Sequence, residues 1–189
     1  QAGFLATMPA SVKLVTWNVN SIRQRLERLI ALLARHAPDV VCLQETKVTD
    51  ADFPVAALRE AGYATAFAGQ KSYNGVAILA KTEPAEVACG VRDGADDAQA
   101  RLIAATVADV RVICAYVPNG QAVGTEKCAY KLEWLERLRR MLEREADAAK
   151  PLALVGDFNV APTDADVHDP EAWRGQVLWD FDGQTWSQG

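Results

Sequence analysis

The amino-acid sequence predicts a layered α+β domain, with helices covering sheets, rather than a doubly wound α/β fold. Two units of strand followed by helix open the chain between residues 12 and 62. Several strand-like segments then follow with no helix between them, and a long helix and one further strand come last. This mixed order indicates an antiparallel meander beside strand–helix units, which is typical of α+β domains.

The first strand–helix unit begins with VKLVTWNVN, a β-branched and apolar run that ends in polar residues. The helix after it has Ser21 as its expected N-cap and ends before Pro38. One apolar face of this helix is formed by Ile22, Leu26, Leu29, Ile30 and Leu33. The second unit is a strand in VVCLQETK and a short helix in VAALREAGY, which Gly62 closes.

The middle of the chain predicts strands separated by glycine, proline or Asp-Gly. These strands lie in YATAFAG, GVAILAK, EVACGV and ARLIAATVADVRVICAYV. The segment AYKLEWLERLRRMLEREADAA returns to helical period through Leu132, Leu135, Leu138 and Leu142. The run KPLALVGDFNV predicts the last strand, and no internal repeat is visible.

Composition indicates a single globular domain of 189 residues, with 50% hydrophobic and 24% charged residues. The net charge of -5 argues against a protein that coats nucleic acid through bulk positive charge, although a local basic rim is compatible with it. Cys42, Cys89, Cys114 and Cys128 lack CxxC spacing, so we expect reduced packing cysteines, no zinc site and a cytoplasmic protein. No apolar run approaches the roughly 18 residues of a membrane helix, and residues 1–11 are interpreted as an N-terminal extension.

Polar residues follow the ends of four predicted strands, where they can converge on one rim. They are Asn18, Asn20, Glu45, Tyr116, Asn119, Asp157 and Asn159. Oxygen ligands without histidine or cysteine suit Mg²⁺ or Mn²⁺, and phosphoester hydrolysis needs such a cation together with a carboxylate that orients water. Glu45 is the candidate ligand and Asp157 the candidate for the water. Taken singly, each of these residues is more often an ordinary turn or strand-end residue.

The segments LVTWNVNSIR, VVCLQETK, YNGVAILAK, AYVPNG and LALVGDFNVAPTDAD together closely resemble the exonuclease III family of abasic-site endonucleases. This family belongs to the endonuclease/exonuclease/phosphatase superfamily, and the resemblance runs in the family's order from residue 12 to 178. It implies a four-layer α/β/β/α sandwich like that of DNase I, incomplete at its C-terminal end. Residues 12–178 would form the N-terminal major part of the domain and 179–189 an unmatched tail.

The resemblance also implies roles for individual residues. Glu45 and Asn18 would hold Mg²⁺, for which Mn²⁺ is an alternative, and Tyr116, Asp157 and Asn159 would be catalytic. Substrate contacts are expected from Asn20, Lys47, Asn74, Arg101 and Asn119. The implied reaction is metal-dependent hydrolysis of the phosphodiester 5' to abasic sites and at 3' ends of duplex DNA, as part of base-excision repair.

The chain departs from this family near its end, because the family's late Ser-Asp-His element has no counterpart before Gly189. His36 and His168 lie outside any such element, and loop or cap roles are expected for both. We therefore expect open strand edges and an apolar sheet face, so that the chain self-associates or needs a complementary fragment, although the family is usually monomeric. The alternatives are a phosphodiesterase or phosphatase of the same superfamily and a catalytically impaired DNA-binding module.

Overall fold

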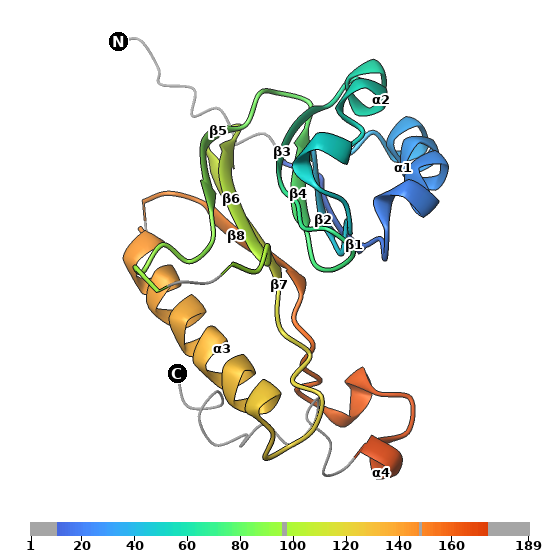
Figure 1. Cartoon of the computed structure of the whole chain (residues 1–189). Helices are drawn as coiled ribbons and strands as arrows, with labels where there is room; N and C mark the ends of the chain where they lie inside the picture. Colours follow the sequence, from blue (N-terminus) through green and yellow to red (C-terminus); the bar gives the residue numbers. More distant parts are fainter. Residues whose placement is uncertain (1–10, 96–97, 148, 174–189) are drawn as a thin grey trace.

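Two four-stranded sheets pack face to face in the computed structural model, with helices on both outer sides (Figure 1). The structure describes residues 11–95, 98–147 and 149–173. The predicted α+β sandwich is confirmed. The predicted tail 179–189, and the predicted N-terminal extension apart from its last residue, lie outside the described residues. Within the described part of the chain, no helix is both long and apolar enough to cross a membrane.

The first sheet has the order β1-β2-β4-β3 and carries helices α1 and α2 on its outer face (Figure 1). Its elements are β1 (Leu14–Asn18), α1 (Ile22–His36), β2 (Val40–Gln44), α2 (Val55–Glu60), β3 (Ala64–Ala68) and β4 (Val76–Ala80). Strands β1 and β2 run parallel, whereas β4 is antiparallel to both β2 and β3. Strand β1 therefore forms one edge of this sheet.

The second sheet has the order β5-β6-β7-β8 and is covered by helix α3 (Figure 1). Its elements are β5 (Ala85–Cys89), β6 (Leu102–Val107), β7 (Val110–Tyr116), α3 (Glu126–Glu145) and β8 (Leu152–Asp157). Strands β7 and β8 are parallel, which pairs Tyr116 with Asp157 at their ends. The short elements η1 (Asp50–Asp52), η2 (Asp164–Asp166) and α4 (Pro170–Trp173) lie in connecting segments.

The predicted antiparallel meander is divided between the two sheets. Strands β3 and β4 pair in the first sheet, whereas β5, β6 and β7 pair in the second. All five residues of β4 are buried, because one face of its sheet packs under the helices and the other against the second sheet. A strand that is apolar on both faces needs cover on both sides, which a single solvated meander does not provide.

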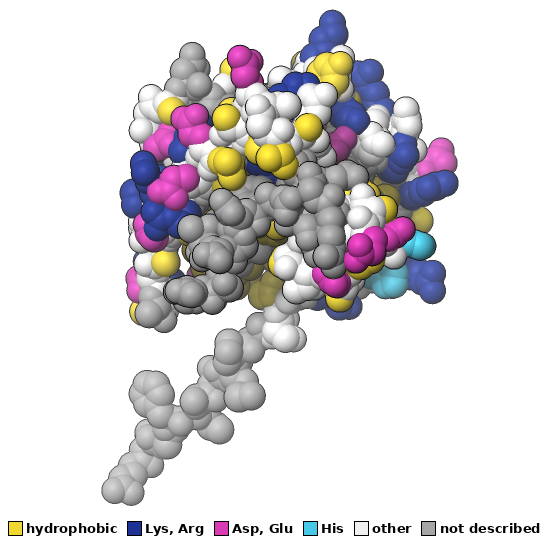
Figure 2. All heavy atoms as spheres, turned by 90° about the horizontal axis from the view of Figure 1, so that it is seen from below, with side chains coloured by type: hydrophobic (Ala, Val, Ile, Leu, Met, Phe, Trp, Pro, Cys, Tyr) yellow, Lys and Arg dark blue, Asp and Glu magenta, His cyan; other side chains and the backbone are white. Residues whose placement is uncertain are grey.

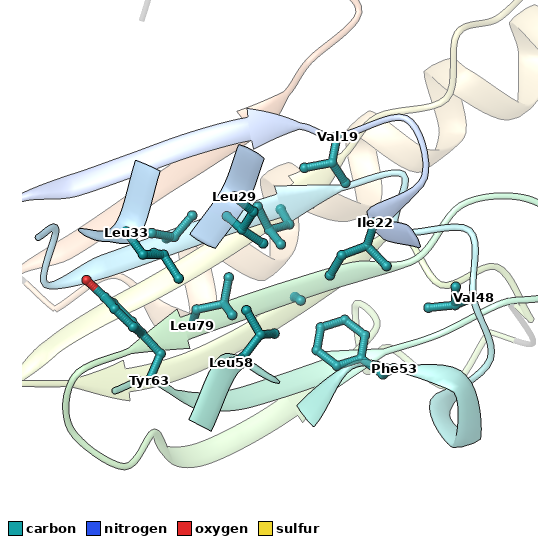
Figure 3. Close-up of a cluster of buried hydrophobic side chains, with 12 residues drawn as sticks. Val19, Ile22, Leu29, Leu33, Val48, Phe53, Leu58, Tyr63 and Leu79 are labelled. Carbon is teal, nitrogen blue, oxygen red and sulfur yellow. The ribbon is translucent and has the colours of Figure 1, made fainter. Parts of the chain in front are cut away.

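Three layers of apolar side chains hold the sandwich together. One cluster lies between the first sheet and helices α1 and α2, and Figure 3 shows its members pointing toward one another. Phe53, a member of this cluster, stacks on Phe67 with ring centroids 4.2 Å apart. The second cluster fills the space between the sheets, and the third lies between the second sheet and α3. Burial on this scale is the main stabilising contribution to such a domain.

The structure refines one detail of the sequence prediction, at Ser21, and shows that two others, at Leu132 and Cys89, are wrong. Ser21 is the N-cap residue of α1 as predicted, but its side chain makes no capping hydrogen bond, because its backbone has φ of 83° instead of the extended conformation of a capping serine. Leu132 is 49% exposed, and Lys131 occupies the core-facing position on α3 instead. Cys89 is exposed at the end of the edge strand β5, so it is not a packing cysteine, whereas Cys42 and Cys114 are buried as predicted.

Candidate active site

The two parallel strand pairs bring their carboxyl ends to the same rim of the sandwich. Strand β1 ends at Asn18 beside the end of β2, and β8 ends at Asp157 beside Tyr116 of β7. The side-chain amide of Asn18 then joins the sheets, because its Nδ2 donates hydrogen bonds to Glu45 Oε1 and Asp157 Oδ2, both at 2.8 Å. Two carboxylates that are distant in sequence thus share one donor.

The orientation of the Asn18 amide is fixed by the following loop. Its Oδ1 accepts a hydrogen bond from the backbone N–H of Asn20 at 3.0 Å, so the Nδ2 must face the carboxylates. In this structure Asn18 therefore acts as a bridge between Glu45 and Asp157. Its role as a metal ligand stays a prediction.

Glu45 is surrounded by donors on both of its oxygens. Lys47 Nζ lies 2.8 Å from Glu45 Oε2 and donates a second hydrogen bond to Asn20 Oδ1 at 2.5 Å. Burial by itself raises the pKa of Glu45, but hydrogen bonds from Asn18, Lys47 and Tyr116 outweigh it and lower the pKa. Glu45 is consequently an anion at neutral pH with its charge directed into the rim.

Tyr116 lies half-buried between Glu45 and Arg101. The Arg101 guanidinium carbon lies 4.7 Å from the centroid of the Tyr116 ring, a cation–π contact, and its Nη1 donates to the Tyr116 carbonyl oxygen at 3.3 Å. Burial, together with the charge and hydrogen bond of Glu45, raises the pKa of Tyr116 to about 12, although Arg101 acts in the opposite direction. The phenol therefore keeps its proton at neutral pH and can donate it in a hydrogen bond.

Asp157 begins a tight turn that presents Asn159. The Asn159 backbone N–H donates to Asp157 Oδ1 at 3.1 Å, and the Asn159 side chain donates to the Val117 carbonyl oxygen at 2.9 Å. Asn119 Nδ2 approaches Asn159 Oδ1 at 3.4 Å. The loops after β7 and β8 are thus held side by side, with one carboxylate and two amides along their common edge.

Gly156 is required where β8 meets β7. A Cβ atom at this position would lie 1.9 Å from the Ala115 carbonyl oxygen, which is backbone and cannot move aside. The turn after the apolar run therefore contains glycine because the two strands approach closely just before Asp157. This close approach of the two strands comes immediately before the position where Asp157 pairs with Tyr116.

Asn74 and Gly75 form the wall of the site beside Lys47. The backbone N–H of Lys47 donates to the Asn74 carbonyl oxygen at 3.0 Å, and that of Thr46 donates to the Gly75 carbonyl oxygen at 3.1 Å. The buried side chain of Asn74 donates to Gln70 Oε1 at 2.8 Å rather than facing Glu45. Its predicted contact with substrate stays a prediction.

All the sequence-predicted site residues belong to one connected network. Asn18 links Glu45, with its partner Lys47, to Asp157. Gln99 Oε1 accepts from Arg101 Nε at 2.7 Å and lies 3.5 Å from Asn74 Nδ2, which joins the outlying members. Sequence reasoning missed Gln70, Gln99 and Lys131. For Lys131 a signal was present, since it lies three and four residues before Trp134 and Leu135 on the apolar stripe of α3.

A cavity of ≈ 550 Å³ opens beside Asp157, lined among others by Asn18, Asn159 and Trp173, whereas Glu45 does not line it. Exposed His168 also lines it, in the loop after η2, so its loop position is as predicted but it faces the site. Figure 2 views the molecule from below Figure 1 and shows Lys and Arg side chains at the margins of that face, mixed with Asp and Glu. Charges of both signs therefore border this face.

The donor set of the rim fits a hard divalent cation. Among the described residues no group of three or more His, Cys, Asp or Glu side chains converges on one point. Glu45 and Asp157 nevertheless direct oxygens to one amide nitrogen, and each carboxylate keeps lone pairs beyond the hydrogen bonds it accepts. Magnesium is commonly held by one or two carboxylates, with water and substrate phosphate completing its coordination. The carboxylates of this site are compatible with such coordination of magnesium.

Comparison with known proteins identifies the family of the chain. The model of the endonuclease/exonuclease/phosphatase family matches residues 15–189. The chain is 35% identical over 161 residues to exodeoxyribonuclease III of Haemophilus influenzae, an alignment that covers 82% of this chain and 60% of that relative. The chain thus spans about three fifths of the length of that curated relative.

Solved structures of DNA-processing enzymes superpose closely on this chain. An AP endonuclease from Archaeoglobus fulgidus superposes with a TM-score of 0.88 at 42% identity, over 92% of this chain and 67% of that one. The 3' phosphatase NExo from Neisseria, solved with a product DNA hairpin, superposes with a TM-score of 0.87 at 42% identity, over 92% of this chain and 68% of that one.

Proposed function

The chain belongs to the endonuclease/exonuclease/phosphatase family, and we propose that it is a metal-dependent nuclease of the exodeoxyribonuclease III and AP endonuclease type. Its substrate is duplex DNA, cleaved 5' to abasic sites and at 3' termini during base-excision repair in the cytoplasm. The observation that carries the proposal is the Asn18 amide, which joins Glu45 and Asp157 at the rim where Tyr116 and Asn159 also lie. A pair of carboxylates can hold a cation beside the negatively charged oxygens of a phosphodiester, and a protonated phenol and amides can donate hydrogen bonds to them.

Glu45 is the residue that would hold a divalent cation, with Asn18 as the second predicted ligand and Mg²⁺ preferred. When bound, this cation offsets charge on the phosphate oxygens and on the departing oxygen. Glu45 suits the role because its lowered pKa keeps it ionised well below neutral pH. Lys47, which pairs with Glu45, offers a positive charge to the same phosphate region.

The reaction requires water to be aligned with phosphorus on the side opposite the departing oxygen. Asp157 orients that water and takes up its proton, because it lies at the rim with Oδ1 on the Asn159 N–H and Oδ2 on Asn18. The Asn159 and Asn119 side chains each have a second amide hydrogen that donates toward the developing charge, and the Tyr116 hydroxyl exchanges Glu45 for a phosphate oxygen as its acceptor when substrate binds. Asn20, Asn74 and Arg101 lie around this centre and contact the DNA backbone.

The experiment is incision of a duplex oligonucleotide that contains one synthetic abasic site, with Mg²⁺ and with EDTA. Asp157→Asn keeps the shape and removes the carboxylate, and we expect it to lower the rate by about 10²- to 10⁴-fold. Glu133→Gln makes the same chemical change on the exposed side of α3 and serves as the control, with an unchanged rate.

Folded protein that gives no metal-dependent incision refutes the proposal and favours the catalytically impaired DNA-binding module. Hydrolysis of small phosphodiesters without incision of DNA favours the other phosphodiesterase of the family. A DNA-binding assay on the same samples separates these two results.

A further inference from the structure

Lys131 is buried completely, at 0% exposure, on the core-facing side of α3. It precedes Trp134, Leu135 and Leu138 on the stripe that packs against the second sheet. An ammonium group in such a position is costly, because its charge loses contact with water. An apolar side chain there would pack without this cost, so the position must gain something that only a charged donor supplies.

The contacts of the Lys131 ammonium show what is gained. Its Nζ donates to the backbone carbonyl oxygen of Asn159 at 2.5 Å and to that of Asn119 at 3.3 Å. These carbonyls belong to the two loops that follow β8 and β7. Partly buried carbonyl oxygens need donors, and lysine has three N–H groups on one atom. One side chain on α3 therefore connects the loop after β7 to the loop after β8.

We propose that Lys131 is a positioning residue, which holds the Asn119 and Asn159 loops in register with Asp157. The proposal rests on the function proposed above, in which the side chains of Asn119, Asn159 and Asp157 act on the same phosphate group.

Direct hydrogen bonds join the loops at Val117, which accepts from the Asn159 side chain and donates to the Asp157 carbonyl oxygen, both at 2.9 Å, but they do not fix Asn119. Asn119 Nδ2 lies 3.4 Å from Asn159 Oδ1, a long hydrogen bond, and Asn119 is exposed. The Asn159 backbone is left-handed, with φ of 48°, a conformation that needs support from its surroundings. The ammonium beneath the loops supplies that support from the protected side, away from solvent and substrate.

The electrostatic setting agrees with this geometry. Burial lowers the pKa of Lys131 to about 8, whereas the nearby Cys128 thiol and Asp157 carboxylate raise it. The ammonium therefore lies within electrostatic reach of Asp157, although it does not need to touch it. Moving the Asn159 loop away from Lys131 would also move the N–H that contacts Asp157 Oδ1.

Amide hydrogen exchange measured by NMR tests the proposal without relying on activity. Three amides report on the tied loops: Val117, bonded to the Asp157 carbonyl; Asn159, bonded to Asp157 Oδ1; and Gln121, bonded to Asn119 Oδ1. Two amides on the opposite wall, Thr46 and Lys47, serve as internal references.

In Lys131→Met, which keeps the length and removes the donors, we expect the three reporters to exchange about 10- to 100-fold faster. The two references should stay within twofold of the wild type. Lys131→Arg, which retains charge and donors, should restore protection, and Lys127→Met on the exposed side of α3 should change nothing. Unchanged reporters, or an equal rise in reporters and references, overturn the proposal.

If Lys131→Met fails to fold, a measurement on the wild-type protein tests the proposal instead. The Nζ protons of Lys131 should exchange with water at least tenfold more slowly than those of Lys127, and equal rates overturn the proposal. On the abasic duplex, Lys131→Met should lower kcat about tenfold with KM unchanged, and Lys131→Arg should recover it. Absence of incision by the wild type refutes the proposed function, while the exchange measurements still decide the role of Lys131.

Discussion

Replacing Asn18 with alanine tests the arrangement on which the site depends. The amide donates to Glu45 and Asp157 at 2.8 Å each, so the two accepting oxygens lie no farther apart than twice that distance. Alanine removes both hydrogen bonds and leaves two like charges facing each other. The variant should therefore be less stable than the wild type in the absence of divalent cations.

The size of the loss follows from these contacts. A hydrogen bond to a charged group contributes about 1.5–3 kcal/mol, and partial exposure of this rim reduces the pair together to about 2 kcal/mol. Repulsion between carboxylates roughly 5 Å apart adds about 1 kcal/mol at the high effective dielectric of a partly exposed site. We therefore expect Asn18→Ala to lower the free energy of unfolding by about 2–3 kcal/mol in EDTA.

Magnesium should return part of this stability, because a cation can replace the amide between the carboxylates. At a magnesium concentration tenfold above its Kd the stabilisation is about 1.4 kcal/mol. Urea denaturation followed by fluorescence, in EDTA and in a magnesium series, measures both quantities. If Asn18 is a bridge, magnesium should stabilise Asn18→Ala at least as much as the wild type.

Thr16→Val is the matched control on the same strand. It removes a neutral acceptor, which Gln44 Nε2 approaches at 3.0 Å, and should cost about 1 kcal/mol without any effect of magnesium. A loss below about 0.5 kcal/mol in Asn18→Ala would refute the bridge. Magnesium that stabilises the wild type but not Asn18→Ala would identify Asn18 as a ligand instead.

Three further predictions use other features of the fold. Gly156→Ala should lower the free energy of unfolding by more than about 4 kcal/mol or fail to fold, since its Cβ would meet the Ala115 carbonyl oxygen at 1.9 Å. Gly94→Ala, where a Cβ meets open space, should lower it by about 1–2 kcal/mol. Equal losses of stability in thermal unfolding would contradict this prediction. Thr46→Val should raise the free energy of unfolding by about 1 kcal/mol, because the buried Thr46 hydroxyl has no hydrogen-bond partner in the described part of the chain; a lower stability in urea would show that the hydroxyl is used. Burial lowers the pKa of Lys131 from 10.5 to about 8, so between pH 8 and 10.5 the unfolded chain binds more protons than the folded protein. The stability of the wild type relative to Lys131→Met should therefore rise with pH in this range. A stability difference that stays constant from pH 8 to 10.5 would contradict this prediction.

The strands could be predicted because their apolar runs are short, β-branched and bounded by glycine or proline. Their division between two sheets could not, since the segment from Ala80 to Ala85 has the same turn residues in a hairpin and in a crossover. The pattern also favoured Leu132 for the core of α3, because leucine is the usual occupant of such a face. Lys131 takes the inward position since its contacts are to loop carbonyls, which no periodicity records.

The edge strands of the sandwich, as the described residues show them, follow from the same topology. Strands β1 and β8 each end a sheet, and every residue of β8 is only partly buried although the strand is mainly apolar. Exposed apolar edge strands promote pairing between chains. Self-association stays a prediction, and its measurement is the concentration dependence of the sedimentation coefficient.

The candidate site residues could be proposed from their types, but their backbone conformations could not be predicted. Asn20, Glu45, Lys47, Asn74 and Asn159 all have positive φ values. Asparagine tolerates this region, whereas Glu45 and Lys47 are held there at a cost of about 1–3 kcal/mol each. Hydrogen bonds offset this cost: the Glu45 carbonyl accepts from Ser21, and the Lys47 N–H donates to Asn74. Because these bonds come from the loops after β1 and before β4, the Glu45 side of the rim forms only when both loops are in place, so its geometry depends on the packing of the first sheet rather than on any one motif.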